Sequence, residues 1–296
     1  MCISTQAASQ SALMDLMRAQ REAFDAREQL STGKKAADLK GYANSAETIL
    51  TARSAQVRAE GFIDANQRLA SRLEVQDLAY RELSDAASQL REALTTTDGT
   101  ALMNNVQAAF DRVVSALSTK FAGSFVFSGV RTDSPPINAS TLAELQAAAP
   151  DVSAVFENAE RRQTTQIDGE TSLDVNRTAS EVAGGLMAVF ERLADFDQGA
   201  NGPFDGPMNA AQQAFIQTEI SNVIAAFDTI NDAMAENGSK QARVEASVRG
   251  HQERSDYLTQ MIADLEDADM AEAASRLTQA QTAVEVSART FASLSQ

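Results

Sequence analysis

Apolar residues at alternating spacings of three and four recur along most of this chain, and this pattern constrains its fold more than any other feature. The longest unbroken series reads Phe62, Asn66, Leu69, Leu73, Gln76, Tyr80, Leu83, Ala87, Leu90 and Leu94. Such spacing places the listed side chains on one helix face, which packs against a partner helix. The chain is therefore predicted to be mainly α, an elongated antiparallel helical bundle or coiled coil formed by its N- and C-terminal halves.

Further series of the same spacing predict further helices. The turn signal Asp98-Gly99 separates the first series from a second one over 102–117, and the two are predicted to form an antiparallel hairpin. Helical spacing returns over 182–196, and a loop rich in Gly, Pro and Asn follows at 197–209. The helix after this loop is expected to end near 236–238, at Glu-Asn-Gly.

The segment after residue 117 changes character. Phe125, Val126 and Phe127 stand close to Gly123 and Gly129, a composition typical of a strand or an extended turn. From 131 to 176 the apolar pattern is weak and proline and glycine interrupt it. This part is predicted to be a small insertion of short strands and loops.

The last two apolar series differ in phase. One runs from Val244 to Leu265 and the other from Met270 to Leu294, so the apolar face rotates around the helix between them. The change falls among the acidic residues of 264–269. Either the helix changes its partner here, or an ordinary kink carries a solvated acidic patch.

The N-terminal apolar series is looser. It comprises Leu13, Leu16, Met17, Ala23, Phe24 and Leu30. Thr32-Gly33 is expected to end this helix, and Lys34, Lys35 and Lys40 follow, where positive charge suits the dipole at a helix C-terminus. Apolar series at both ends of the chain indicate that the ends pair with each other or with other copies.

Charge and hydropathy exclude two classes of partner. The chain has 25 basic and 41 acidic residues, a net charge of −16, whereas affinity for nucleic acid rests on clustered Lys and Arg. No apolar run approaches the length of a transmembrane helix, so no membrane association is expected. The N-terminus lacks a basic start followed by an apolar stretch, and no cleavable signal peptide is expected.

The sequence contains no arrangement typical of catalysis or of metal binding. A single cysteine, Cys2, and a single histidine, His251, exclude an internal disulfide framework and a two-histidine metal site. His251 lies on a helical series and is expected to be a packed structural residue. There is no G-x-S-x-G, P-loop or G-x-G-x-x-G motif, and the acidic cluster lacks EF-hand spacing. We expect no catalytic, cofactor-binding or metal-binding residues and no enzymatic activity.

Four segments, in this order and spacing, resemble the bacterial flagellin family. They are LSTGKK at 30–35, FVFSGVRTDSPP at 125–136, ARVE at 242–245 and DLEDADMAEAASRLTQAQTAVEVSA at 264–288. The resemblance spans nearly the whole chain, and the C-terminal block is its most specific part. One departure follows the LSTG segment, where flagellins commonly carry an acidic D-D-P-A-G-like stretch and this chain reads AADLKGYANSAE. This departure weakens the interpretation as a filament subunit.

The resemblance implies a structural subunit of the flagellum that forms the junction between hook and filament and seeds filament assembly. Implied partners are other copies in a ring, the neighbouring hook-associated protein 1, flagellin and an export chaperone. It further implies secretion through the flagellar type III apparatus and no cofactor. The nearest alternative is a flagellin subunit of the filament itself. A cytoplasmic helical scaffold module and a hydrolase are the alternatives from other classes.

The resemblance also implies three structural parts. Residues 1–40 and 266–296 are expected to form terminal axial-core helices, disordered in the monomer. Residues 41–130 and 177–265 would form the helical bundle, and 131–176 a small outer insertion. The candidate assembly interface lies on the two terminal series and comprises Leu13, Leu16, Met17, Phe24, Leu277, Val284, Phe291 and Leu294.

Overall fold

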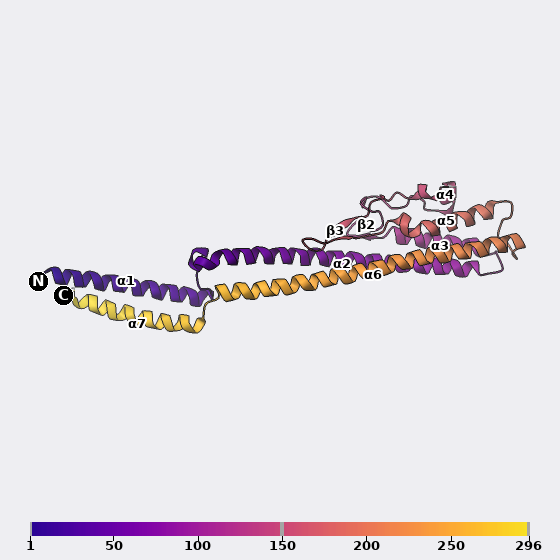
Figure 1. Ribbon diagram of the computed structural model, residues 1–296. Helices are drawn as coiled ribbons and strands as arrows, with labels where there is room; N and C mark the ends of the chain where they lie inside the picture. The colour runs from indigo at the N-terminus through magenta and orange to yellow at the C-terminus, as the bar shows by residue number, and fades with distance from the viewer. Residues whose placement is uncertain (1, 149–150, 295–296) are drawn as a thin grey trace. The chain divides into compact units, whose positions relative to one another are not determined.

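The computed structural model describes residues 2–148 and 151–294, with the side chains of residues 2–6, 8, 9 and 294 left aside. Long helices dominate it (Figure 1), and 73% of it is helical. The α-helices are α1 (Cys2–Thr32), α2 (Ala46–Leu94), α3 (Leu102–Leu117), α4 (Leu142–Ala147), α5 (Ala179–Gln198), α6 (Ala210–Glu266) and α7 (Met270–Leu294). Two 3₁₀ helices, η1 (Leu39–Ser45) and η2 (Val152–Val155), lie between them. The prediction of a mainly α fold with a small insertion is confirmed.

The chain divides into two compact units. Unit 1 comprises residues 1–60 and 252–296, and unit 2 comprises residues 61–251. Both divisions fall inside long helices, the first in α2 and the second in α6. No helix in the described part of the chain is long and apolar enough to cross a membrane.

The core of unit 2 follows the longest apolar series. Leu73, Leu83 and Leu90 of α2 are fully buried, and α3 begins and ends where its series predicts. The Nη1 atom of Arg112 on α3 donates to Oε1 of Gln89 on α2 at 3.0 Å, as expected for a hairpin of neighbouring helices. The core is completed by the apolar face of α5, as its spacing over 182–196 predicts.

The two polar residues that interrupt the α2 series are buried, and the side-chain amide nitrogen of each donates a hydrogen bond. Nδ2 of Asn66 donates to the backbone carbonyl of Ile167 at 2.8 Å, and Nε2 of Gln76 donates to that of Val126 at 3.4 Å. A buried amide without such a partner would lose its hydration uncompensated. These residues therefore connect the helix to the segment between α3 and α5.

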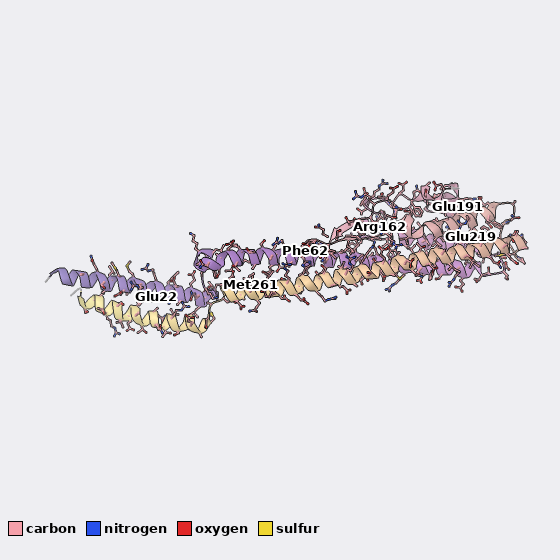
Figure 2. The ribbon with its side chains drawn as sticks, in the orientation of Figure 1. Glu22, Phe62, Arg162, Glu191, Glu219 and Met261 are labelled. Atoms are coloured by element: carbon pink, nitrogen blue, oxygen red, sulfur yellow. The ribbon has the colours of Figure 1, made fainter. Side chains whose placement is uncertain are left out.

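The expected helix end at Glu236-Asn237-Gly238 is wrong, because α6 runs without interruption through this tripeptide. Asn237 is 3% exposed, and its Nδ2 donates to the carbonyl of Leu73 at 2.9 Å. Glu236 pairs with Arg177 at 2.6 Å, with Lys240 at 2.7 Å and with Arg162, which Figure 2 labels, at 3.7 Å. These tertiary contacts outweigh the cost of a mid-helix glycine, about 1 kcal/mol.

The segment between α3 and α5 contains the predicted extended structure together with the short helices α4 and η2. Strands β1 (Lys120–Phe121) and β2 (Ser124–Phe125) form an antiparallel pair, with Lys120 opposite Phe125. Strands β3 (Thr164–Gln166) and β4 (Ser172–Asp174) form a second antiparallel pair within the 131–176 insertion. The insertion also includes α4, which the sequence prediction missed. Six residues are too few to display helical periodicity, although Thr141 caps this helix by accepting from the Glu144 amide.

His251 is a structural residue, as expected. Its ring stacks on that of Phe62, labelled in Figure 2, at 4.9 Å between ring centroids and an interplanar angle of 10°. Its Nε2 lies 3.2 Å from the carbonyl oxygen of Ile167, which also accepts from Asn66 and Ser247. The tip of the β3–β4 hairpin is thereby held by side chains of α2 and α6.

The change of phase near residue 265 marks a break between two helices. Helix α6 ends at Glu266, and α7 begins at Met270. Oδ1 of Asp269 accepts from the backbone amides of Ala271 at 2.9 Å and Glu272 at 3.1 Å, which caps the start of α7. The acidic patch is solvated in part, because Asp264, Asp267 and Asp269 are exposed, whereas Glu266 is only 2% exposed.

Candidate assembly interface

Helices α1 and α7 lie side by side within unit 1 (Figure 1). The face of α1 toward α7 carries Ala12, Ala19 and Ala26, all buried, with Leu16 and Leu30 half-buried between and after them. With the half-buried Ala23, these positions repeat at spacings of three and four, which is the pattern of a coiled-coil seam. The seam, termed here the alanine seam, is built mainly from methyl groups.

Helix α7 presents a matching face. Ala273 and Ala280 are buried at 0% and 3% exposure, and Leu277, Val284 and Phe291 are half-buried. These residues are the C-terminal series that the sequence places on one face. Three of the expected interface residues thus face α1, while the side chain of the fourth, Leu294, lies outside the described residues.

The N-terminal candidates separate onto two faces of α1. Leu16 belongs to the alanine seam, but Leu13, Met17 and Phe24 are 42%, 55% and 67% exposed. The interpretation of one loose N-terminal series is therefore corrected. At 100° per residue, Leu13, Met17 and Phe24 fall within about 40° of one another, at about 120° around the helix from the centre of the seam.

Four exposed apolar side chains form a second apolar face of α1, termed here the outer stripe. Its members are Leu13, Met14, Met17 and Phe24. A shallow hollow on this helix is lined by Met17, Gln20, Arg21 and Phe24. Large apolar side chains grouped on one helix face mark an interaction surface more often than single exposed ones do.

The sequence signal that separates these faces is the alanine series. Ala12, Ala19 and Ala26 repeat every seven residues, whereas Leu13, Met17 and Phe24 of the outer stripe each stand one residue after Ala12, Leu16 and Ala23 of the alanine seam. A search for large apolar residues gives alanine little weight and merges the two series. Counting alanine as a seam residue would have separated them.

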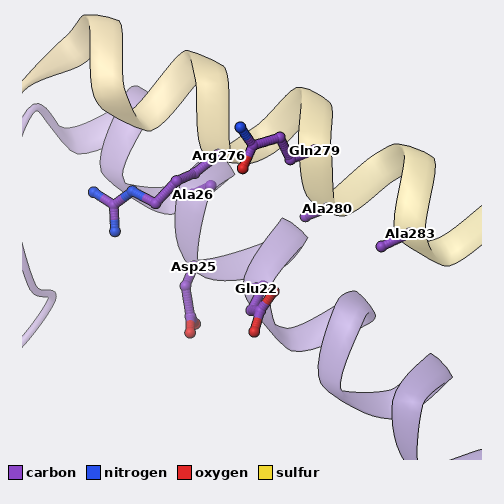
Figure 3. Close-up of a pocket in the computed structure, with 7 residues that line it drawn as sticks. All are labelled: Glu22, Asp25, Ala26, Arg276, Gln279, Ala280 and Ala283. Atoms are coloured by element: carbon purple, nitrogen blue, oxygen red, sulfur yellow. The ribbon is translucent and has the colours of Figure 1, made fainter.

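A small groove runs where α1 and α7 meet (Figure 3). It is lined by Glu22, Asp25 and Ala26 of α1 and by Arg276, Gln279, Ala280 and Ala283 of α7. The charged members and Ala283 are exposed, and Ala26 and Ala280 are buried between the two helices. Within the described part of the chain, no three or more His, Cys, Asp or Glu residues lie close enough to hold a metal ion.

The terminal pair is almost neutral. Helix α1 carries three arginines and four acidic residues, and α7 carries two arginines and two glutamates. The net charge of −16 therefore resides almost entirely in the rest of the chain. Copies of a neutral helix pair can approach one another without the like-charge repulsion that the remainder of the chain would create.

Comparison with known protein families assigns both ends of the chain. Residues 3–132 match the bacterial flagellin N-terminal helical region, and residues 220–296 match the bacterial flagellin C-terminal helical region. Together these two regions cover more than half of the sequence. The chain belongs to the bacterial flagellin family, and it is a structural subunit of the flagellum.

Solved structures show the same fold at low sequence identity. A putative flagellar hook-associated protein from Vibrio parahaemolyticus is 16% identical with a TM-score of 0.61, and the match covers 74% of this chain and 96% of that one. FlgL of Bacillus cereus is 12% identical with a TM-score of 0.54, and the match covers 73% of this chain and 99% of that one. No curated protein sequence matches the chain.

Proposed function

We propose that this chain forms the junction between hook and filament and seeds filament assembly. The observation that carries this proposal is the fold likeness to the putative flagellar hook-associated protein from Vibrio parahaemolyticus, over 96% of that protein's length. The flagellin regions at both ends support a flagellar subunit, and the fold likeness favours a hook-associated one. Export through the flagellar type III apparatus, without a cleaved signal peptide, belongs to the same proposal.

A flagellin subunit of the filament itself is the second candidate, because filament flagellins share both terminal regions. The sequence after LSTG, AADLKGYANSAE, weakens this candidate, since it lacks the acidic stretch common in flagellins. The two roles differ in location and in number of copies. Location therefore distinguishes them.

Gold-labelled antibody on isolated flagella provides the test. We expect label confined to a short zone between hook and filament. Label along the whole filament would establish the second candidate, and label only inside the cell would indicate a scaffold. Deletion of the gene should leave hooks without filaments and release flagellin into the medium.

We further propose that α1 and α7 make the assembly interface. The alanine seam would join the two helices within one subunit, and the outer stripe of α1 would pack against neighbouring subunits. Neighbours would be other copies in the ring, hook-associated protein 1 on one side and flagellin on the other. Before export, a chaperone would cover the same apolar surface. The near neutrality of the pair and the exposure of Met17 and Phe24 support this proposal.

Replacement of Phe24 by aspartate tests the outer stripe. Phe24→Asp should abolish incorporation at the hook tip, because assembly would bury an unpaired charge. Thermal unfolding of the isolated chain should stay unchanged, since Phe24 is 67% exposed. Ser11→Asp is the matched control, because Ser11 is exposed and its direction, at 100° per residue, is about 60° from both Met14 and Ala26, the nearest members of the two apolar faces. Normal incorporation of Phe24→Asp would contradict the proposed interface.

A further inference from the structure

Basic and acidic residues far apart in the sequence meet within unit 1, where α1 ends and where α6 gives way to α7. Nζ of Lys34 lies 2.6 Å from Oδ1 of Asp267 and 3.4 Å from Oε2 of Glu266. The backbones of Lys34 and Asp267 form an isolated antiparallel bridge. The hydrogen bond to Asp267 raises the pKa of Lys34 above its usual value.

Glu266 is the buried centre of this cluster. Its side chain is 3% exposed and pairs with both Lys34 and Arg53, whose side chains are 41% and 53% exposed. Nη2 of Arg53 lies 2.5 Å from Oε1 of Glu266. A buried carboxylate is tolerated only while its partners remain, because removing them leaves an uncompensated charge.

Lys35 completes the cluster by binding backbone carbonyl groups at the end of α6. Its Nζ donates to the carbonyls of Asp264 at 2.7 Å and Leu265 at 3.0 Å, in the last turn of α6. Its backbone amide donates to the carbonyl of Glu266 at 2.7 Å. Besides following the C-terminus of α1, where positive charge was expected, Lys35 therefore caps the C-terminus of α6. Gly33, at φ +70°, provides the turn that brings the two lysines here.

The alanine seam by itself specifies its register weakly. Its alanines repeat every seven residues on α1, and Ala273 and Ala280 repeat at the same interval on α7. A shift by one heptad would again place alanine on alanine. In coiled coils, polar or charged residues at defined positions fix such a register.

We propose that five residues form a charge latch, namely Lys34, Lys35, Arg53, Glu266 and Asp267. The latch sets the register of α1 against α7, and it holds together the end of the pair where α1 ends and α7 begins. The latch supplies the specificity that the seam lacks, because its contacts are satisfied in one alignment only. Fraying of the pair then starts at the free ends of α1 and α7 and stops at the latch. This property belongs to the isolated chain, so its test does not depend on the junction role.

Distances between two spin labels test the register. One label replaces Arg18 on α1 and the other replaces Arg289 on α7, with Cys2→Ser to remove the native thiol. The wild-type latch should give one narrow distance distribution. Lys34→Glu should broaden this distribution or displace it by about 10 Å, the length of one heptad along a helix. The charge exchange Lys34→Glu with Asp267→Lys should restore the narrow distribution.

Amide exchange separates latch opening from general unfolding. In Lys34→Glu, amides of 26–32 and 270–276 should exchange about tenfold faster or more, because Glu266 faces a new like charge. Amides of 83–113 in unit 2 should keep their wild-type rates. Arg58→Glu is the control, since Arg58 is an exposed residue of α2 outside the cluster. An unaltered narrow distribution in Lys34→Glu, or unprotected amides beside the latch in the wild type, would overturn the proposal.

Discussion

The core of unit 2 and the α1–α7 pair use the same apolar spacing with side chains of different size. In unit 2 the buried positions hold Tyr80, Phe127, Phe110 and Phe190, whose rings meet edge to face at 5.3 Å and 5.5 Å between ring centroids. In the terminal pair the buried positions hold alanine, and the larger residues are half-buried or exposed. Spacing thus defines the face of a helix, and side-chain size determines how much stability that face provides.

Because of this difference, the two regions contribute unequally to the stability of the folded chain. Burial of a large apolar side chain contributes about 1.5–3 kcal/mol, and alanine contributes much less. Unit 2 therefore contains the large buried side chains that contribute most to the stability of the chain. The terminal pair gains little from its own seam and, in the proposed role, completes its burial against neighbouring subunits.

The largest effect on stability is expected in the core of unit 2. Leu83→Ala should lower the free energy of unfolding by about 2–5 kcal/mol, because Leu83 is fully buried and its removal leaves a cavity. Leu73→Ala should act similarly through the smaller cluster around Ile167 and Val244. Denaturant unfolding gives the value. Leu78→Ala, at a 56% exposed position of the same helix, is the control. If Leu78→Ala lowered the free energy of unfolding as much as Leu83→Ala does, the core assignment would be contradicted.

A smaller loss of stability is expected at the contact between α2 and the β3–β4 hairpin of the insertion. Asn66→Ala removes the donor to the Ile167 carbonyl and to Oγ of Ser247, at 2.8 Å and 3.1 Å. The loss should be about 1–3 kcal/mol, with faster amide exchange in the β3–β4 hairpin. Gln67→Ala, at the exposed neighbouring position, should leave both quantities unchanged. A hairpin that keeps its protection without Asn66 would mean that Ser247 and His251 suffice.

The smallest effect on folding, and the largest on assembly, is expected at the C-terminal seam. Phe291→Asp or Val284→Asp should lower the unfolding free energy of the isolated chain by much less than Leu83→Ala does, because the alanine-rich α1–α7 pair contributes little apolar burial of its own. The same variants should fail to incorporate and leave cells with bare hooks. A destabilised monomer with normal filaments would show that this helix belongs to the stable core.

Much of the fold could be predicted from the sequence, because heptad spacing is a local signal. Leu69, Leu83 and Leu90 point to one face whatever the partner helix is. The passage of α6 through Asn237-Gly238 could not be predicted, since the carbonyl of Leu73 that holds Asn237 lies 164 residues away. Helix-ending residues report local preference, and here a tertiary contact overrides it.

The terminal site was predicted in part. The sequence identified the α7 face that meets α1, because Leu277 and Val284 are large and regularly spaced. It missed the division of α1 into two faces, because alanine carries little hydrophobic weight. It also missed the charge latch, since Lys34 and Asp267 are 233 residues apart and each has a local interpretation of its own.

Two of the four side chains in the outer stripe are methionines, Met14 and Met17. Methionine is unbranched and polarisable, so its thioether can adopt several rotamers and fill surfaces of different shape. A stripe of leucine or isoleucine would fit one partner contour well and others poorly. The outer stripe is therefore suited to conform to neighbours that are not identical to one another, which a ring placed between two different polymers would have to accommodate on its opposite rims.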